Sequence, residues 1–457
     1  MTKKYHFWIS GCQMNYADAR QVAQKLEVAG YCPTDEAEEA DVIVLQTCTV
    51  RQQAEDKALG RLSSLRPLKE RNQDLTLAMM GCAVGVRGNQ KLTDRFPFVD
   101  VWLPPASDGL ELMAFLEQGA DQQFEIDSAE KRFSIQDGEM ALPIQQRKEL
   151  ISAPVAVVYG CSHACTFCII PHRRGIERTR PVGAIVSEVK SLVREGVKEV
   201  VLLGQIVDRY GKDIPDGPDL ADLLGKVHEV KGLERIRFLT SHPSYMTESI
   251  LRAVAELPKV MPQIEIPIQA GDDDILKEMN RGYTADQYRL LVEMIRNLVP
   301  EAAVHNDVIV GFPRETNEQF QKTVDILAEL KLDKVHIARY SPRPGTVSGR
   351  RMEDSVPDSE KRRRFHVVEE LQKQISERKN ARWLGKDVEI LVEDTHKGRW
   401  RGRSPQGKLV FFDDPRDLKG ELVTVHITYT GPWSMSGVAA DNLNAKPAVE
   451  SISIPVN

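Results

Sequence analysis

Short apolar runs alternate with polar, helix-forming stretches along the first hundred residues. The apolar runs are 5–10, 41–46, 75–80 and 99–103, and the polar stretches between them include 18–29 and 52–65. Alternation of strand-like and helical segments is typical of an α/β layer with a mostly parallel sheet. We therefore expect an N-terminal α/β domain over residues 1–120.

A second and longer alternation follows. Its expected strands are 153–159, 199–203, 235–240, 263–268, 304–310 and 334–339, and its expected helices are 182–195, 219–230, 247–257, 285–298 and 315–330. Six βα units that run in one direction predict a barrel or partial barrel, whose active face is the C-terminal edge of the strands. We assign residues 147–377 to this domain and the polar, irregular residues 121–146 to a linker.

The pattern changes again near the C-terminus. The charged segment 361–382 predicts a long surface helix, and short β-like runs follow at 386–392, 408–412 and 422–428. Turns rich in Gly, Asp and Pro separate these runs, which is typical of a small β-barrel. The expected fold is thus α/β, with a parallel-sheet domain, a (βα)6 partial barrel and a small β-barrel over residues 378–442.

Composition narrows the class of protein. The chain has 457 residues, of which 41% are hydrophobic and 28% are charged, and its net charge is −6. These values exclude a largely disordered chain, a collagen-like fibre and a globally basic nucleic-acid binder, although they allow a local basic module. No run approaches the roughly 18 apolar residues of a membrane helix, and the N-terminus lacks a signal-peptide pattern. We expect a cytoplasmic protein with no membrane partner.

Seven cysteines, an odd number, argue against a disulfide framework in such a protein. Cys12, Cys48 and Cys82 each follow an expected strand directly or within a few residues. Ligands gather beyond the carboxyl ends of parallel strands, so these three thiols could meet at one point. Taken singly, each could also be a small buried hydrophobic residue. Cys32 has no such partner and is interpreted as a structural or surface thiol.

The sharpest motif is CxxxCxxC, formed by Cys161, Cys165 and Cys168 on a loop after an expected barrel strand. Three thiolates on one loop can hold three corners of a [4Fe–4S] cluster and leave the fourth iron open for a substrate. The alternative is a Cys₃His zinc site that uses His163 or His172.

These motifs together resemble a known family. The CxxxCxxC loop on a βα barrel resembles the radical S-adenosylmethionine (SAM) superfamily. Gly-Cys-Gln-Met-Asn at 11–15, Thr-Cys-Thr-Val-Arg at 47–51 and Gly-Cys at 81–82 are similar to motifs of its methylthiotransferase family, MiaB-type branch. Two departures are Gln46 in place of the family's Asn and Gly-Gln-Ile-Val-Asp-Arg-Tyr at 204–210 in place of Gly-Gln-Asn-Val-Asn-Ser-Tyr.

The resemblance implies a function for each cysteine set. Cys161, Cys165 and Cys168 would hold the [4Fe–4S] cluster that binds SAM, and Cys12, Cys48 and Cys82 would hold an auxiliary [4Fe–4S] cluster where sulfur is attached and methylated. SAM would serve as methyl donor and as source of the radical that removes hydrogen from C2 of adenine. An aromatic C–H bond has no useful acidity, so a general base would not suffice.

The implied substrate is N6-isopentenyl-adenosine-37 in the anticodon stem-loop of tRNA, with a sulfur source and an electron donor as further partners. Sister enzymes of the family act on threonylcarbamoyl-adenosine-37 or on ribosomal protein S12, and both remain alternatives. An alternative from another class is a non-catalytic zinc-binding RNA adaptor that uses the C-terminal barrel, which resembles a TRAM domain.

Further candidates for cofactor contact lie near the expected active face. Gln205, Gln269 and Asp307 follow or end barrel strands and could contact SAM or the base, or could simply cap strands. Glu177 and Arg180 follow the cysteine loop and could face the SAM carboxylate or an RNA phosphate, with surface solvation as the alternative. His336 alternates on a strand, so we expect it to pack inside the barrel.

The expected RNA contact rests on local charge. Residues 378–440 carry eleven Lys/Arg against eight Asp/Glu, although the whole chain is acidic. The basic residues cluster at 396–403 around Trp400, a composition that suits phosphate contact and base stacking if the indole is exposed. A solvated hairpin is the alternative interpretation.

Overall fold

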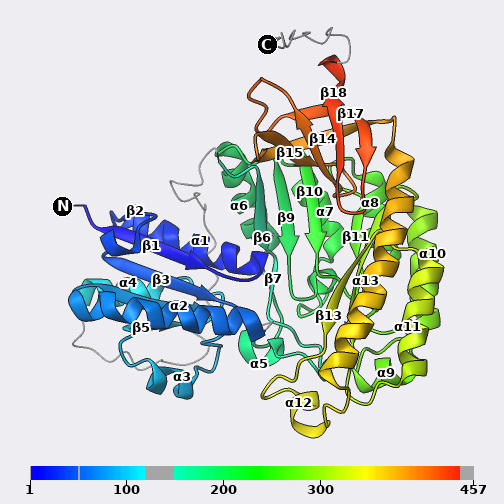
Figure 1. Cartoon of the computed structure of the whole chain (residues 1–457). Coiled ribbons are helices and arrows are strands. Elements are labelled where there is room, and N and C mark those ends of the chain that lie inside the picture. Colours follow the sequence, from blue (N-terminus) through cyan, green and yellow to red (C-terminus); the bar gives the residue numbers. More distant parts are fainter. Residues whose placement is uncertain (1, 50–51, 119–148, 443–457) are drawn as a thin grey trace, which may run out of the picture. The chain divides into compact units, whose positions relative to one another are not determined.

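The computed structural model describes residues 2–49, 52–118 and 149–442 (Figure 1). The chain forms two compact units, Met1–Glu369 and Glu370–Asn457. Within the described ranges, none of the helices combines the length and apolar character needed to cross a membrane. The expected linker at 121–146 lies outside the described residues.

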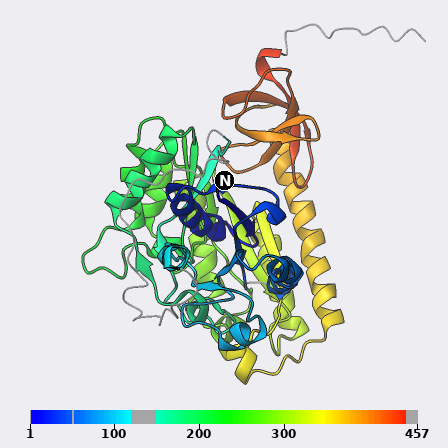
Figure 2. The same ribbon diagram turned by 90° about the vertical axis from the view of Figure 1, so that its left-hand side faces the viewer.

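A five-stranded parallel sheet forms the N-terminal part of the first unit (Figure 2). Its strands are β1 (Lys4–Ile9), β2 (Cys32–Pro33), β3 (Val42–Thr47), β4 (Thr76–Gly81) and β5 (Val101–Leu103), in the order β2-β1-β3-β4-β5. Its helices are α1 (Gln13–Val28), α2 (Gln52–Arg71), α3 (Gln90–Arg95) and α4 (Leu110–Gln118).

Both faces of this sheet are buried, as the apolar strands require. Val42 and Val44 pack in one core cluster with residues of α1 and α4, whereas Ile43 and Leu45 pack in the other with residues of α2 and α3. The prediction of an N-terminal α/β layer is confirmed. The predicted start of the first helix at residue 18 was wrong, because α1 begins directly after Cys12 and buries Asn15 and Asp18.

Six parallel strands form the centre of the first unit, in two sheets of three. The strands are β6 (Ser152–Ala156), β9 (Glu199–Leu203), β10 (Arg235–Leu239), β11 (Gln263–Glu265), β12 (Ala303–Val310) and β13 (Lys334–Arg339). The sheets, ordered β10-β9-β6 and β11-β12-β13, meet where the Ile236 N–H donates to the Lys259 carbonyl and the Met261 N–H donates to the Ile236 carbonyl. Pairing among the described residues leaves β6 and β13 as outer strands.

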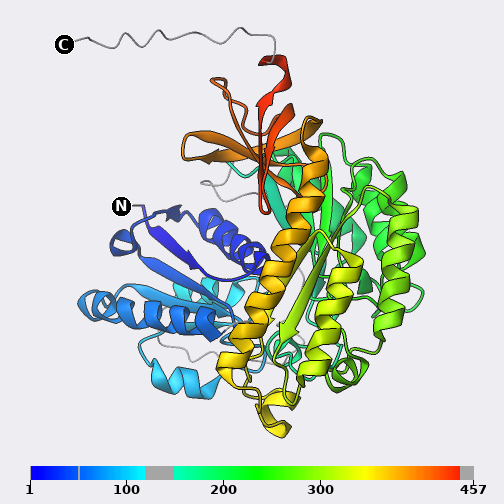
Figure 3. The ribbon, with the colours of Figure 1, turned by 45° about the vertical axis from the view of Figure 1, so that its right-hand side comes forward.

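Helices connect these strands. They are α6 (Val182–Arg194), α7 (Leu220–His228), α8 (Glu248–Glu256), α9 (Asp273–Glu278), α10 (Ala285–Leu298) and α11 (Asn317–Leu330). Figures 1 and 3 show α10 and α11 side by side on the same face of the second sheet. Thr284 and Thr316 begin α10 and α11 with complete capping boxes, so both helix starts follow from sequence.

One expected strand is divided, and the division positions the cysteine loop. The chain leaves the first sheet after Ala156 and forms β7 (Val158–Tyr159), which pairs antiparallel with β8 (Arg178–Thr179). The CxxxCxxC loop and the short helix α5 (Ile170–Arg174) lie between β7 and β8. This two-stranded ribbon therefore closes the base of the loop.

The prediction for His336 was wrong. Its side chain is exposed on β13 instead of packed in a core, while the neighbouring Val335 is buried. Because β13 is the outer strand of its sheet, one of its edges is not paired with a further strand among the described residues, and most of its side chains are exposed.

The second unit contains a closed five-stranded barrel. Its strands are β14 (Asp387–His396), β15 (Arg399–Arg403), β16 (Leu409–Asp413), β17 (Leu422–Thr430) and β18 (Met435–Ala439), closed in the order β14-β15-β16-β18-β17. The helix α13 (Asp358–Asn380) precedes it, and α12 (Val347–Arg351) precedes α13. The predicted small barrel is confirmed, although β15 and β18 carry too little apolar alternation to be recognised from sequence.

Candidate functional site

The sheet edge of the N-terminal part brings three distant cysteines together. Cys12, Cys48 and Cys82 follow β1, β3 and β4, which are neighbours in the sheet. A hydrogen bond to Cys48, together with burial, raises the pKa of Cys12. Burial, reinforced by electrostatic interaction with Cys12, raises the pKa of Cys82. We name this set the strand-end cysteines.

Gly11 permits this close approach. Its φ of +113° lies in the region that favours glycine, and a Cβ at this position would lie 2.3 Å from the Cβ of Cys48. A side chain of any kind at residue 11 would therefore push β1 away from the end of β3.

A buried arginine from beyond the cysteine loop contacts the strand-end cysteines. The Nε of Arg174 donates to the Cys82 Sγ at 3.2 Å, and its Nη2 donates to Asn15 Oδ1 and Asp18 Oδ2, both at 3.0 Å. The Arg174 side chain is 2% exposed and the Asp18 side chain is 0% exposed. The site therefore combines three soft thiols with one fixed cation.

A second arginine approaches the same site from the end of the barrel. Arg343 follows β13, and its Nη1 donates to Gln52 Oε1 at 2.7 Å and lies 3.8 Å from Glu55 Oε2. Burial lowers the pKa of Arg343, and electrostatic interactions with Glu55, Cys48 and Asp56 act against this shift. Arg343 thus joins the chain after β13 to the start of α2, four residues after Cys48.

The CxxxCxxC residues form a second set, which we name the loop cysteines. The N–H of Cys161 donates to the Gly175 carbonyl at 3.0 Å, and the N–H of Cys168 donates to the Cys165 carbonyl at 3.1 Å. Gly160, with a φ of +68°, passes so close to the returning chain that a Cβ there would lie 2.0 Å from the Ile176 carbonyl oxygen. The loop is therefore closed by contacts between its own two ends.

A buried arginine also contacts the loop cysteines. Arg281 donates from Nη1 to the Cys165 Sγ at 3.3 Å, from Nη2 to the Pro267 carbonyl at 3.0 Å and from Nε to the Tyr283 hydroxyl at 2.9 Å. Unlike Arg174, it makes these three hydrogen bonds with a thiol, a backbone carbonyl and a hydroxyl, and none of them with a carboxylate. Its positive charge is therefore less offset by a neighbouring negative charge than that of Arg174, which pairs with Asp18.

Neither histidine of the zinc alternative joins the cysteines. The His163 ring nitrogens lie 3.2 Å from the Asn280 carbonyl and 3.4 Å from the Tyr245 hydroxyl, and His172 is exposed. In the described ranges, no group of three or more His, Cys, Asp or Glu is arranged to hold a single metal ion. That finding does not test a four-iron cluster, which spaces its thiolate ligands more widely than one ion does.

The thiols themselves fit such a cluster. Burial raises the pKa of Cys161 to about 11 and that of Cys168 to about 12. Without bound metal both are therefore protonated near neutral pH, and metal binding would release their protons. Two sets of three soft sulfur donors, each with a buried arginine that donates to one sulfur, suit iron–sulfur ligation.

Gln205 precedes a residue that packs against the loop cysteines. It follows Gly204 at the carboxyl end of β9, and the next residue, Ile206, packs in one apolar cluster with Cys161 and Cys168. A polar side chain at this strand end, beside the loop, fits a contact with a bound cofactor.

Glu177 is tied to the cysteine loop by its backbone. Its N–H donates to the Ser162 Oγ at 3.0 Å, and its carboxylate pairs with Arg209 at 2.7 Å. Its second oxygen, Oε1, is buried and has no hydrogen-bond partner among the described residues. An unsatisfied acceptor beside the loop fits a donor group of a ligand.

Gln269 and Asp307 meet through the backbone. The N–H of Gln269 donates to the Asp307 carbonyl and its carbonyl accepts from the Ile309 N–H, both at 2.9 Å, with a φ of +72° at Gln269. Burial, reinforced by the Asp307 carboxylate, raises the pKa of Glu265 to about 7. The structure thus adds Glu265 to the polar groups on these strands.

Arg180 gains no support as a cofactor contact. Its Nη1 donates to the Ala156 carbonyl at 2.6 Å and pairs with Glu188 at 2.7 Å, both inside the fold. The guanidinium therefore joins β6 to α6, which is a structural role inside the fold.

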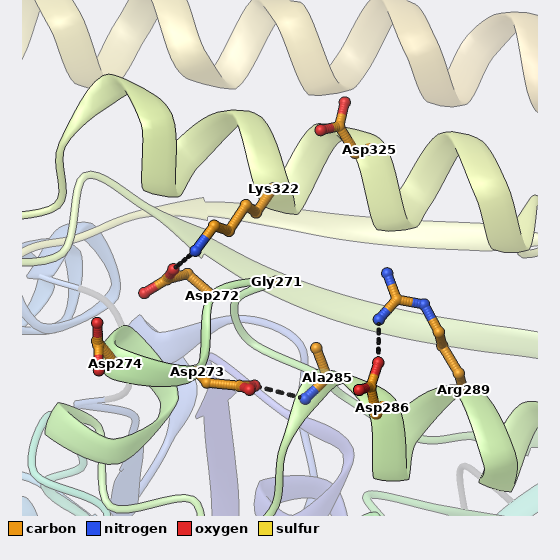
Figure 4. A pocket seen from close by; sticks show the side chains of 9 residues that line it. All are labelled: Gly271, Asp272, Asp273, Asp274, Ala285, Asp286, Arg289, Lys322 and Asp325. Carbon is orange, nitrogen blue, oxygen red and sulfur yellow. Dashed lines mark hydrogen bonds and ion pairs between the residues drawn. The ribbon is translucent and has the colours of Figure 1, made fainter.

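A cavity of about 300 Å³ lies elsewhere, between α9, α10 and α11 (Figure 4). Lys322 pairs with Asp272 at 2.7 Å and Arg289 pairs with Asp286 at 2.7 Å across its wall. No cysteine lines it, so it is separate from both cysteine sets.

In the basic cluster at 396–403, three arginines form surface ion pairs. Arg399, Arg401 and Arg403 pair with Asp413, Asp394 and Glu393, respectively. Trp400 is only half-exposed, and its indole N–H donates to the carbonyls of Asp414 and Arg416. The indole is therefore not a free stacking surface, whereas the three arginines stay partly exposed to solvent.

Sequence reasoning missed the two arginines at the cysteines. Arg174 lies in the segment that follows CxxxCxxC, and Asn15 lies in the Gly-Cys-Gln-Met-Asn motif, so both were near a recognised signal. Arg281 lies 116 positions from Cys165 and carried no signal.

Comparison with known proteins gives three family matches. Residues 4–104 match the model described as "Uncharacterized protein family UPF0004", residues 155–327 match the Radical SAM superfamily and residues 381–439 match the TRAM domain. Together they cover most of the chain in the order expected from sequence.

Curated relatives match over nearly the whole chain. A protein of Roseiflexus sp. is 46% identical over 96% of this chain and 90% of its own length. Proteins of Chloroflexus aurantiacus and Herpetosiphon aurantiacus are each 42% identical, over 97% and 95% of this chain and 93% and 97% of their own lengths. All three are named tRNA-2-methylthio-N(6)-dimethylallyladenosine synthase.

Solved structures support the fold. The radical S-adenosylmethionine methyltransferase TsrM from Kitasatospora setae, with cobalamin and a [4Fe-4S] cluster bound, matches with a TM-score of 0.58 and 13% identity over 76% of this chain and 77% of its own. The cobalamin-dependent radical enzyme OxsB matches with a TM-score of 0.53 and 13% identity over 82% of this chain and 56% of its own. At such identities the likeness concerns the fold alone.

Proposed function

We propose that this chain, which belongs to the family of tRNA-2-methylthio-N(6)-dimethylallyladenosine synthases, adds a methylthio group to C2 of N6-isopentenyl-adenosine-37 in tRNA. The observation that carries the proposal is the presence of two separate three-cysteine sites in one unit, each with a buried arginine that donates to a sulfur. A methylthio insertion needs two such sites, one for hydrogen removal and one for sulfur.

The loop cysteines Cys161, Cys165 and Cys168 would hold a [4Fe–4S] cluster with SAM at its open iron, and the strand-end cysteines Cys12, Cys48 and Cys82 would hold a second [4Fe–4S] cluster. When bound, these groups would supply one-electron cleavage of SAM, a methyl group and a bound sulfur. An electron donor and a sulfur source are then required partners, and a cytoplasmic location remains part of the proposal.

The chain's own residues would orient the cofactor and limit water. Glu177 offers the unsatisfied Oε1, and Gln205 lies at the strand end beside Cys161, so both suit the polar groups of SAM. Gln269 and Asp307 are further candidates at neighbouring strand ends. The apolar side chains of Ile170 and Ile206 pack against the loop and lower its exposure to solvent.

The tRNA contact in the TRAM domain is proposed on exposed aromatic residues together with the partly exposed arginines of the basic cluster. Tyr429 is 59% exposed and Trp433 is 57% exposed, on and directly after β17. Aromatic side chains of this kind can stack on unpaired bases of an RNA loop.

The experiment uses tRNA that carries the isopentenyl group but lacks the methylthio group. The reconstituted protein, SAM, a reductant and sulfide are incubated with it under anaerobic conditions, and nucleosides are analysed by mass spectrometry. We expect a methylthio gain on isopentenyl-adenosine and about eight irons per chain, as two [4Fe–4S] clusters require.

Other results would redirect the proposal. SAM cleavage without methylthio gain would favour threonylcarbamoyl-adenosine or a ribosomal-protein aspartate as the substrate. Intact SAM despite full iron loading would overturn the radical reaction, and zinc in place of iron would favour the RNA adaptor. The variant Cys161→Ala is the control, because it should lose turnover while the second cluster remains.

A further inference from the structure

The contact of Arg174 with Cys82 lies in a buried environment, where a charged side chain is unusual. The guanidinium is a buried cation that touches one thiol and one fully buried carboxylate, Asp18. Burial of a charge pair costs desolvation energy that the mutual attraction often fails to recover. Stability of the fold is therefore a weak explanation for this arrangement, and the adjacent thiols suggest another.

Two polar atoms of this pair lack partners. Arg174 Nη1 and Asp18 Oδ1 are buried and make no hydrogen bond within the part of the chain that the structure describes. A buried donor without an acceptor is costly, so a further acceptor is expected at this position when the site is in use. The sulfides and thiolates of a [4Fe–4S] cluster are acceptors of this kind and carry negative charge.

The position of Arg174 links the two cysteine sets. It ends α5, six positions after Cys168, and a helix of five residues is only about 7.5 Å long. The preceding residue, Arg173, contacts the segment that follows Cys82, because its carbonyl accepts a hydrogen bond from the Val86 N–H at 2.9 Å. The arginine at the strand-end site is thus fixed by the loop that carries the other cysteines.

We infer that Arg174 is a positioning residue for the auxiliary cluster, which fixes the Cys82 sulfur and raises the reduction potential of the cluster, and that Asp18 offsets part of this effect. The inference rests on the second cluster of the proposed function. Reduction potentials of iron–sulfur clusters depend on nearby charge and on hydrogen bonds to the sulfurs, and Arg174 supplies both.

The test isolates the auxiliary cluster in the full-length chain. The parent variant carries Cys161→Ala, Cys165→Ala and Cys168→Ala, is reconstituted with iron and sulfide, and is titrated electrochemically with electron paramagnetic resonance as the readout. In this parent, Arg174→Gln should shift the potential to more negative values, because a cation that favours the reduced cluster is removed. Asp18→Asn should shift it to more positive values, because the arginine charge is no longer offset.

Arg174→Lys is the conservative variant. It keeps the charge but cannot bond Cys82, Asn15 and Asp18 at once, so we expect a potential between those of the parent and Arg174→Gln. Cluster retention during dialysis against a chelator should fall by roughly tenfold or more in Arg174→Gln, as is usual for residues that orient metal ligands.

Arg20→Gln is the matched structural control. Arg20 is also a buried arginine of the first unit, 3% exposed, but it joins α1 to β6 by donating to the Pro154 carbonyl at 3.2 Å. We expect its removal to leave the potential of the auxiliary cluster unchanged.

The outcomes separate the two proposals. Opposite shifts for Arg174→Gln and Asp18→Asn support the inference, because a purely structural role would lower iron content in both without opposite signs. Unchanged potentials with about four irons per chain would overturn the inference and keep the second cluster. A parent that binds no iron would overturn the second cluster itself. If Arg174→Gln holds no iron, the other two variants decide the test. A negative shift of the potential in Arg174→Lys with a positive shift in Asp18→Asn supports the inference, and any other pair of signs overturns it.

Discussion

The strand-end cysteines and the loop cysteines are both sets of three thiols contacted by a buried arginine, but the chain brings them together in different ways. In each set a glycine with positive φ, Gly11 or Gly160, precedes the first cysteine, and one buried arginine donates to one sulfur. The loop cysteines lie within eight residues, whereas the strand-end cysteines are spread over positions 12 to 82. The geometry of one loop can bring the loop cysteines together, but only the register of a parallel sheet can bring the strand-end cysteines together.

The electrostatic settings also differ. Arg174 is paired with the buried Asp18, whereas Arg281 donates to a tyrosine hydroxyl, a backbone carbonyl and Cys165. The two sites therefore place different net charges beside similar thiols. This difference would give the two proposed clusters distinct reduction potentials.

The largest effect should come from removal of each cysteine set in turn. Replacement of the loop cysteines by Ala should abolish SAM cleavage, whereas replacement of the strand-end cysteines should keep SAM cleavage and abolish methylthio insertion. Each variant should retain about four of about eight irons. Iron analysis and chromatography of 5′-deoxyadenosine measure both. Loss of all iron in either variant would show that the sites do not form independently.

Glycine replacements should break one site at a time. Gly11→Ala should lower iron only at the strand-end site, since the new Cβ would lie 2.3 Å from that of Cys48. Gly160→Ala should lower it only at the loop site, where the Cβ would meet the Ile176 carbonyl at 2.0 Å. Gly88→Ala is the control, because Gly88 has a φ of +71° but nothing within 4 Å. Equal iron loss in all three would attribute the effect to backbone strain alone.

Arg281→Gln should slow SAM cleavage while the strand-end site keeps its iron. Loss of the donor to Cys165 and of the positive charge should cost roughly 10- to 100-fold in rate, as for other residues that support metal ligands. The rate of 5′-deoxyadenosine formation is the measurement. Arg289→Gln, on the exposed side of α10, is the control. A rate equal to that of the unmodified protein would contradict a role for Arg281.

The smallest effect concerns Asp208, next to the pair Arg209–Glu177 beside the loop. Burial raises the pKa of Asp208 to about 8, so its contribution to stability is present at low pH and falls as the pH rises from the ordinary carboxyl range through about 8. Asp208→Asn keeps the uncharged form at every pH. Its melting temperature should equal that of the unmodified protein near pH 4 and exceed it by about 2 °C or more near pH 9.

The control for this measurement is Glu256→Gln, which removes an exposed carboxyl on α8. A difference for Asp208→Asn that does not change with pH would show that the carboxyl is charged in the fold across this range.

Much of the fold follows from sequence because its elements are locally encoded. The apolar runs located most strands, and capping residues such as Thr284 and Thr316 set helix starts. The strand predicted at 153–159 was wrong because its apolar pattern continues across Val157, where the chain leaves the sheet. Trp400 was interpreted as a possible stacking residue, since no local pattern shows that its indole packs inward.

The sequence by itself determined the loop set, because the spacing of its thiols is a property of neighbouring residues, and it placed each strand-end cysteine after an expected strand. Only the tertiary structure decided that these strand ends lie side by side and which groups surround both sets. Arg174 meets Cys82 across 92 positions and Asn15 across 159, and Arg281 meets Cys165 across 116. Such contacts depend on how whole elements pack, and a buried charge is tolerated only where that packing supplies its partners.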